Sequence, residues 1–211
     1  MRVRLRPPGD RREDSGQTLI ELLVVMLLMS GLSTIVYGVL ISVQRQTADT
    51  VRRADSVDQA RLALSQIDRQ VRSGNVFYDP VLETLPMSMR VYTQSNGVAS
   101  CVQWQVTGRQ LRTRSWDPAV LPPVATAWRT VARDIDNDDD LDGVPSTIDP
   151  EWPFALAGGG TTTSYGQRLV DVLLKLRDTD SRGAAVEIRA SLSGRNTQYG
   201  FDPGVCVSPT P

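Results

Sequence analysis

The feature that most constrains this chain is an apolar stretch near its N-terminus, Ser15 to Val43. Its main part, Leu22 to Val43, runs for 22 consecutive residues without a charge. As an α-helix, a segment of that length measures about 33 Å, which is enough to cross the hydrocarbon core of a bilayer. The stretch therefore predicts a membrane-spanning helix.

The residues before this span predict its orientation. Five arginines and three acids precede it: Arg2, Arg4, Arg6, Arg11, Arg12, Asp10, Glu13 and Asp14. A basic segment ahead of an apolar span holds the N-terminus in the cytoplasm. No small-x-small cleavage site follows the span, which argues against an ordinary secretory signal that is removed. We therefore expect a single-pass protein whose C-terminal part lies outside the cytoplasm.

Glu21 is the anomaly of the apolar stretch. An acid at the edge of a span costs up to about 2.5–3.5 kcal/mol on insertion scales, so we expect it to have a cationic partner. The sequence holds no Lys or Arg between Glu21 and Arg45. The partner therefore has to come from outside this segment.

The segment Gly16–Met26, GQTLIELLVVM, resembles the class III signal of type IV prepilins and type II secretion pseudopilins. In that family a cytoplasm-facing prepilin peptidase cuts after the Gly and methylates the new N-terminus. The resemblance implies cleavage after Gly16, methylation at Gln17, and a salt bridge from Glu21 to the freed amine of a neighbouring subunit. Gln17 stands where the family usually has Phe or another apolar residue, and this difference concerns the efficiency of methylation rather than cleavage. The alternative is a plain signal anchor with an incidental Glu.

The helical pattern continues beyond the span. Gln44 to Ser73 contains neither Pro nor Gly, and Ser73-Gly74-Asn75 is a stop signal. We therefore predict one helix from about Thr18 to Ser73. Apolar residues recur along its second half at spacings of three and four, which predicts one buried face: Val57, Ala60, Leu64, Ile67 and Val71.

After Asn75 the apolar period changes to two. The segments that read as strands are Met89 to Tyr92, Val102 to Val106, Gln110 to Trp116, Val170 to Leu176 and Val186 to Leu192. Thr107-Gly108 and the polar stretch 177–183 predict the turns of two hairpins, whereas Trp128 to Ile135 suits a strand or a short helix. We expect an α+β fold: a long N-terminal helix, membrane-spanning and then amphipathic, packed on a mostly antiparallel β-sheet. This is also the pilin layout.

Two further segments, Ala63 to Pro80 and Ser193 to Asn196, resemble the minor-pilin branch related to pseudopilin J and PilW-like proteins. The organisation we expect follows from these segments. It comprises a leader at 1–16, a transmembrane or filament-core helix at 17–43, an amphipathic helix at 44–75 and a β-rich exoplasmic domain at 76–211.

Within that domain an acidic loop, 134–149, has the spacing of a calcium site. Six aspartates fall within nine residues, and Gly143 sets the frame of an EF-hand-type loop. The predicted ligands are Asp138, Asp140, Asp142, the Val144 carbonyl, Ser146 and Asp149. Asp149 replaces the usual Glu at the last position, and Pro145 stands where EF-hands usually have an aliphatic residue. A solvated acidic loop is the alternative.

The chain has two cysteines, Cys101 and Cys206, and both follow the span. Disulfides persist outside the cytoplasm, so we predict that these two residues are paired. The alternative is two reduced cysteines, each packed as a small apolar residue.

Composition argues against several functions. The chain has no His and a formal net charge of −1, so it offers neither histidine chemistry nor a general basic field for nucleic acid. Arg109, Arg112 and Arg114 lie near Trp104 and Trp116 in the sequence and could contact DNA, but a solvated strand face is the simpler interpretation. No nucleophile motif or phosphate loop stands out, and we do not expect an enzyme.

Three functions remain open. The first is a minor pilin or pseudopilin that enters or primes a filament. Its partners would be other pilins, the prepilin peptidase and an inner-membrane assembly platform. The second is a minor pilin displayed at the tip of a competence or adhesion pilus, where it binds DNA or a surface. The third is a signal-anchored membrane enzyme.

Overall fold

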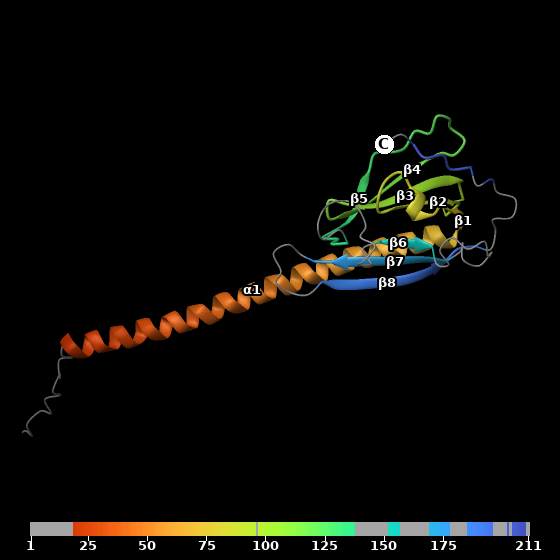
Figure 1. Cartoon of the computed structure of the whole chain (residues 1–211). Coiled ribbons are helices and arrows are strands. Elements are labelled where there is room, and N and C mark those ends of the chain that lie inside the picture. Colours follow the sequence, from red (N-terminus) through yellow and green to blue (C-terminus); the bar gives the residue numbers. More distant parts are fainter. Residues whose placement is uncertain are drawn as a thin grey trace, which may run out of the picture. The chain divides into compact units, whose positions relative to one another are not determined.

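A computed structural model describes residues 19–95, 97–137, 152–156, 169–177, 185–195, 202 and 204–209 (Figure 1). The chain forms two compact units, Met1–Ala48 and Asp49–Pro211. One helix, α1, runs over Leu19–Arg72 and belongs to both units. The predicted helix is therefore confirmed, with its C-terminal end one residue before the predicted one.

The end of α1 is capped by hydroxyl groups. The Ser73 hydroxyl donates to the Arg69 carbonyl at 2.8 Å, and the Thr93 hydroxyl donates to the Gln70 carbonyl at 3.0 Å. These bonds satisfy carbonyls that a helix terminus leaves without intrahelical partners. Arg69 and Arg72 also place positive charge at the negative end of the helix dipole.

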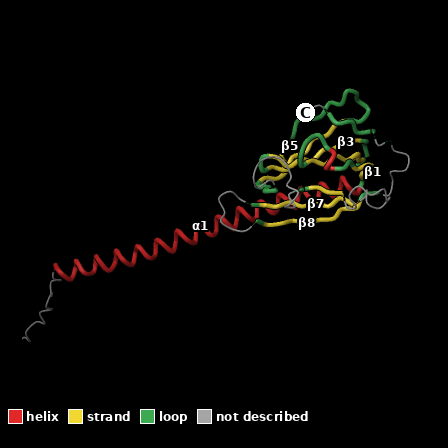
Figure 2. Tube along the Cα trace, in the orientation of Figure 1, coloured by secondary structure: helices red, strands yellow, loops and turns green. Residues whose placement is uncertain are grey.

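The strands form two antiparallel sheets rather than the one that the sequence suggested (Figure 2). The five-stranded sheet has the order β1-β2-β3-β4-β5, and the three-stranded sheet has the order β6-β7-β8. The first comprises β1 Gly74–Phe77, β2 Ser88–Thr93, β3 Ser100–Thr107, β4 Gln110–Trp116 and β5 Arg129–Arg133. The second comprises β6 Phe154–Leu156, β7 Leu169–Leu176 and β8 Val186–Ser193, and a short 3-10 helix, η1, covers Pro80–Leu82.

Strand boundaries follow the sequence closely where the alternation is regular. β4 coincides with its predicted range, β7 begins one residue before its predicted range, and β8 ends one residue after its predicted range. The ambiguous stretch before Ile135 is a strand. β1 and β6 were not predicted: β1 begins inside the stop signal of the helix, and β6 has only three residues.

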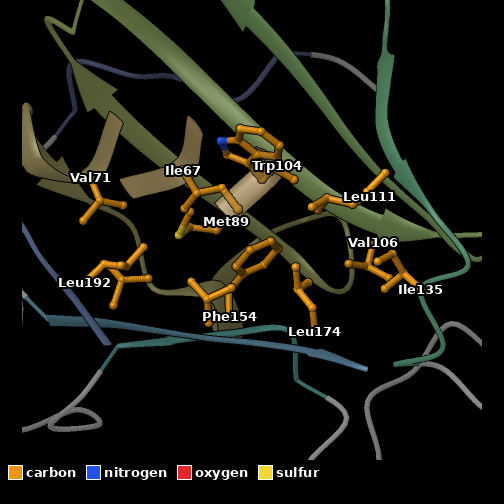
Figure 3. Packing of buried hydrophobic residues seen from close by; sticks show 14 of the residues in the cluster. Ile67, Val71, Met89, Trp104, Val106, Leu111, Ile135, Phe154, Leu174 and Leu192 are labelled. Atoms are coloured by element: carbon orange, nitrogen blue, oxygen red, sulfur yellow. The ribbon is translucent and has the colours of Figure 1, made fainter. Parts of the chain in front are cut away.

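The main core lies where α1 and both sheets meet. Figure 3 shows Phe154 and Leu174 of the three-stranded sheet pointing towards Met89 and Trp104 of the five-stranded sheet. From α1 the buried residues are Ser56, Ala60, Ala63, Ile67 and Val71. Ser56 and Ala63 thus replace Val57 and Leu64, which are only half-buried, because the buried stripe is rotated slightly from the predicted one.

The turn between β3 and β4 is made by Gly108 and Arg109, which both have positive φ angles of 54° and 61°. Two residues of this conformation suit the twist of a tight hairpin. Arg109 is not a glycine, and its guanidinium bonds to the Asp136 carboxylate and the Arg177 carbonyl. These contacts anchor the turn to the segment that follows β5.

Candidate functional site

The predicted processing site lies mostly outside the described residues. Gly16 and Gln17 fall in the undescribed N-terminal segment, and nothing in the structure bears on cleavage or methylation there. Glu21 is described, and it occupies the first turn of α1. A carboxylate in that position interacts favourably with the positive end of the helix dipole.

Glu21 is exposed, and within the described part of the chain its side chain forms no ion pair or hydrogen bond. The next cation along α1 is Arg45, and a helix rises 1.5 Å per residue, so the two lie about 36 Å apart along the axis. A helix cannot bend to close that gap. Within α1, no cation therefore lies within reach of Glu21.

The rest of the apolar half of α1 suits a lipid environment. The helix is long and apolar enough to cross a membrane by length and composition, and its side chains are exposed from Leu19 through Val43. Three hydroxyls in or just after this stretch bond back to helix carbonyls: Ser30 to Leu27, Thr34 to Ser30 and Thr47 to Val43, each at 2.9 Å. Polar groups that are satisfied internally are tolerated at membrane depth. The helix is consistent with single-pass anchoring.

The predicted calcium ligands, from Asp138 to Asp149, lie outside the described residues. The start of the acidic loop is described, and its acids have protein partners. Asp136 pairs with Arg109 and lies 3.5 Å from Arg177, while Asp134 accepts a hydrogen bond from Ser56 at 2.8 Å. In the described part of the chain no cluster of acids, histidines or cysteines has the arrangement of a metal site.

Asn137 attaches this same segment to the three-stranded sheet. Its amide nitrogen donates to the Leu173 carbonyl at 2.9 Å, and its side-chain oxygen accepts from the Lys175 N–H at 3.0 Å. An isolated bridge also joins Ile135 to Leu176. The base of the acidic loop is therefore fixed to β7, whatever its remaining residues bind.

Cys101 and Cys206 are joined by a disulfide, so the predicted pairing is present in the structure. Cys101 lies on β3 and Cys206 in the C-terminal segment, 105 residues later. The bridge sits in a second apolar cluster with Val76, Tyr92 and Trp116. The Cys206 N–H also donates to the Tyr78 hydroxyl at 3.0 Å. The bond thus holds the described C-terminal residues against the five-stranded sheet.

The arginines of β4 are not a solvated strand face. The Arg114 residue is 6% exposed, and Arg112 is half-buried. Arg112 donates to Gln105 and Arg114 to Gln103, at 2.8 and 2.9 Å, and both guanidinium carbons lie 4.5 Å from the centre of the Trp128 ring. Burial lowers the pKa of both groups. The solvated interpretation was wrong because alternation cannot reveal that both faces of β3 and β4 are covered.

The tryptophans named beside these arginines lie elsewhere. Trp104 is fully buried in the main core, where its indole N–H donates to the Gln70 side chain at 2.7 Å. Trp116 is 4% exposed beside the disulfide. The residue that stacks on the arginines is Trp128, which sequence reasoning did not single out, because it lies between β4 and β5 and reaches them only through strand pairing.

The structure also contains a buried ion pair between Glu83 and Arg90 that the sequence analysis did not predict. The Glu83 side chain, 2% exposed, lies 3.0 Å from Arg90 and also accepts a hydrogen bond from Gln103. The Arg90 guanidinium stacks on Tyr78, 4.1 Å from the ring centre. Burial raises the pKa of Glu83 despite the attraction of Arg90, and burial likewise raises the pKa of Tyr78. No local sequence signal links Glu83 to Arg90, since the loop after η1 brings them together.

Comparison with protein-family models gives no match, and comparison with curated protein sequences gives none either. The functional argument therefore depends on the residues of this chain.

Proposed function

We propose that this chain is a minor pilin or pseudopilin, inserted into or priming a type IV pilus-like or type II secretion filament. A prepilin peptidase would cut after Gly16, and other pilins and an inner-membrane assembly platform would be its partners. The chain would reside in the cytoplasmic membrane, with its C-terminal domain outside, before entering the filament. Its role in this proposal is structural rather than catalytic.

One observation carries the proposal: Glu21 is an acid in the first turn of an apolar helix that offers no cation for about 36 Å. A charge in that position is costly in a membrane unless it is paired. Cleavage five residues before Glu21 would create a new amino group, and the same group on a neighbouring subunit would supply the missing cation. Cleavage after Gly16 would thus account for an otherwise unpaired acid in the apolar helix.

Two features of the second unit agree with this proposal. The disulfide between Cys101 and Cys206 suits a domain outside the cytoplasm, where such bonds persist. The second half of α1 buries Ala60, Ala63, Ile67 and Val71 in the domain core, so the same helix that would enter a filament is anchored to the domain it carries.

The experiment is a charge-neutralising substitution, Glu21→Gln, compared with Asp49→Asn as a control. Asp49 is an exposed acid on the same helix beyond the apolar stretch. Breaking a buried ion pair typically costs about 3–5 kcal/mol, so Glu21→Gln should reduce recovery with other filament subunits by at least about tenfold. Insertion and cleavage should remain intact, because an expensive charge has been removed from the span.

Recovery is measured by affinity purification of detergent-extracted filaments. Asp49→Asn should assemble as the unmodified chain does. Equal recovery of Glu21→Gln and the unmodified chain would show that Glu21 has no part in assembly and would remove the basis of the proposal.

A further inference from the structure

β8, Val186–Ser193, is the outermost strand of the three-stranded sheet, and no strand that the structure describes pairs with its outer edge (Figure 1). It pairs with β7 over all of its eight residues without a bulge. The edge strands β1, β5 and β6 have only four, five and three residues, and the pairing of β1 and of β5 contains a register shift. Short or irregular edges resist further pairing, whereas a long, regular edge is a template for another strand.

The hydrogen bonds of β7 show which backbone groups of β8 lie on this open edge. The Leu173 N–H donates to the Pro153 carbonyl at 2.9 Å, on the side of β7 that faces away from β8. The Lys175 carbonyl accepts from the Asp136 N–H at 2.7 Å on the same side. Because the direction alternates along a strand, odd-numbered residues of β7 bond away from β8 and even-numbered ones bond towards it.

The open edge is therefore formed by the odd-numbered residues of β8. The register pairs even-numbered residues of the two strands with one another, as in Leu174 with Ile188. The even-numbered residues of β8 thus bond to β7, and the N–H and C=O groups that point outwards belong to Glu187, Arg189, Ser191 and Ser193. An extended backbone complements such a row of groups, whereas a helix uses its own N–H and C=O groups internally.

The side chains of β8 describe the segment that would fit beside it. On the face that covers the core, Val186, Ile188 and Ala190 are only half-buried, although they pack against the main core. On the opposite face Glu187 and Arg189 are exposed, and Arg189 Nη2 lies 2.8 Å from the Glu187 carboxylate. A neighbouring strand complements this edge when it carries a base opposite Glu187, an acid opposite Arg189 and apolar residues between them.

A second copy of this chain is a poor occupant of the edge. A two-fold axis that sets β8 antiparallel to its copy also reverses α1, because α1 packs on the same sheet. Copies that are anchored in one membrane by this helix point in the same direction, so that arrangement is closed to them. A two-fold axis along the strands keeps the helices parallel but sets the apolar face of one sheet beside the charged face of the other. The segment that fits therefore belongs to a different polypeptide.

We propose that the open edge of β8 binds an extended segment of a different polypeptide, which adds a strand to the three-stranded sheet. The segment carries an acid opposite Arg189 and a base opposite Glu187. Its apolar side chains cover the half-buried Val186, Ile188 and Ala190. Recognition by strand addition obtains affinity from backbone hydrogen bonds and specificity from side chains. The proposal does not depend on assembly into a filament.

The test measures amide hydrogen exchange by NMR on the full chain in nonionic detergent micelles. The probe is the peptide Val-Thr-Val-Glu-Val-Lys-Val-Thr with blocked ends, which, antiparallel to β8, sets its Glu opposite Arg189 and its Lys opposite Glu187. Without peptide, the N–H groups of Arg189 and Ser191 should exchange faster than those of Ile188 and Ala190, which bond to β7. With saturating peptide, exchange at Arg189 and Ser191 should slow at least about tenfold, because these groups gain acceptors.

The matched peptide has the same sequence but is N-methylated at Glu and Lys, whose N–H groups would bond to β8. It should bind at least about tenfold more weakly, because two hydrogen bonds are lost without a change of charge. This comparison uses the unmodified chain and does not depend on the folding of a variant.

Two variants of β8 test the edge from the other side. Ser191→Pro should weaken the unmethylated peptide at least about threefold, since it removes an outward N–H and spares the bonds to β7. Arg189→Met should weaken it about two- to fivefold by removing a cross-strand charge pair. Arg133→Met, a matched control at an exposed arginine of the edge strand β5, should leave binding unchanged.

Slower exchange at Arg189 and Ser191 that N-methylation of the peptide weakens would support the proposal. The proposal is overturned if exchange at these residues does not slow, or if the N-methylated peptide binds as tightly as the unmethylated one. Slow exchange at these residues without peptide, increasing with the concentration of the chain, would show that a second copy occupies the edge. That result would also overturn the proposal.

Discussion

Glu83 shows how one ionisable residue is tied to the fold of the second unit. Its carboxylate faces Arg90 and Gln103 in a layer that water hardly reaches. Burial disfavours the charged form and raises the pKa above the usual value of 4.5, with the attraction of Arg90 acting in the opposite direction. The folded state therefore binds a proton more tightly at this position than the unfolded state does.

The consequence is a stability difference that depends on pH. A raised carboxyl pKa contributes stability that is present below the unfolded pKa and lost as the pH rises through the folded pKa. The unmodified chain should therefore lose stability relative to Glu83→Gln as the pH rises from about 4 towards neutrality. Chemical denaturation of both chains across this range measures the difference. A constant difference would show that Glu83 titrates alike in both states.

At the scale of elements, α1 serves two environments with one continuous helix. Its first half exposes apolar side chains on every face, while its second half buries a stripe of mostly small residues against the two sheets. Ala60 and Ala63 allow the sheets to approach the helix, and Ile67 and Val71 fill the space between them.

This division predicts that two apolar residues of the same helix contribute very differently to the free energy of unfolding. Ile67 is 0% exposed and Leu62 is 69% exposed. Ile67→Ala should lower the free energy of unfolding by about 2–5 kcal/mol, since it removes buried methylene groups and leaves a cavity. Leu62→Ala should change it by less than about 0.5 kcal/mol. Denaturant titration of the full chain in detergent measures both, and similar losses would contradict the placement of the buried face.

The acidic loop, 134–149, gives a second prediction about one structural element, namely that it binds calcium. Its base is fixed to β7 through Asn137, and its predicted ligands follow directly. If calcium binds only the folded chain, the melting temperature should rise with millimolar calcium by mass action. Asp140→Ala combined with Asp142→Ala should abolish that rise, and magnesium should substitute poorly because it prefers a tighter octahedral shell. If calcium does not change the melting temperature, the loop is an acidic, solvent-exposed loop and the predicted calcium site is wrong.

For the whole molecule, regular patterns were predictable and long-range placement was not. The 54-residue helix and the strands of both hairpins follow from periods of 3.6 and 2 that are written locally in the sequence. The division into two sheets is not written locally. The contacts of Ile135 and Asn137 with β7, which attach the segment after β5 to the three-stranded sheet, join residues roughly forty positions apart and were not predictable either.

The candidate sites also differ in whether a local sequence signal marks them. Glu21 stands out in the sequence because it is the only acid in an apolar run, and Cys101 and Cys206 are the only two cysteines. A hollow lined by Gln66 and Gln70 of α1 and by Thr113 of β4 was not predicted, because the packing of the helix on the sheet and the loop before β5 create it together. Burial of both faces of β3 likewise hid the stacking of Arg112 and Arg114 on Trp128.

The central claim is that this chain is processed as a prepilin and that the processed end complements Glu21. Its most direct test is the intact mass of the protein purified from cells with and without a prepilin peptidase. With the peptidase, we predict a chain that begins at Gln17 and carries one methyl group, and without it a chain that retains residues 1–16. A mature protein that keeps Met1 in both cells, or one cut beyond Val43, would contradict the account.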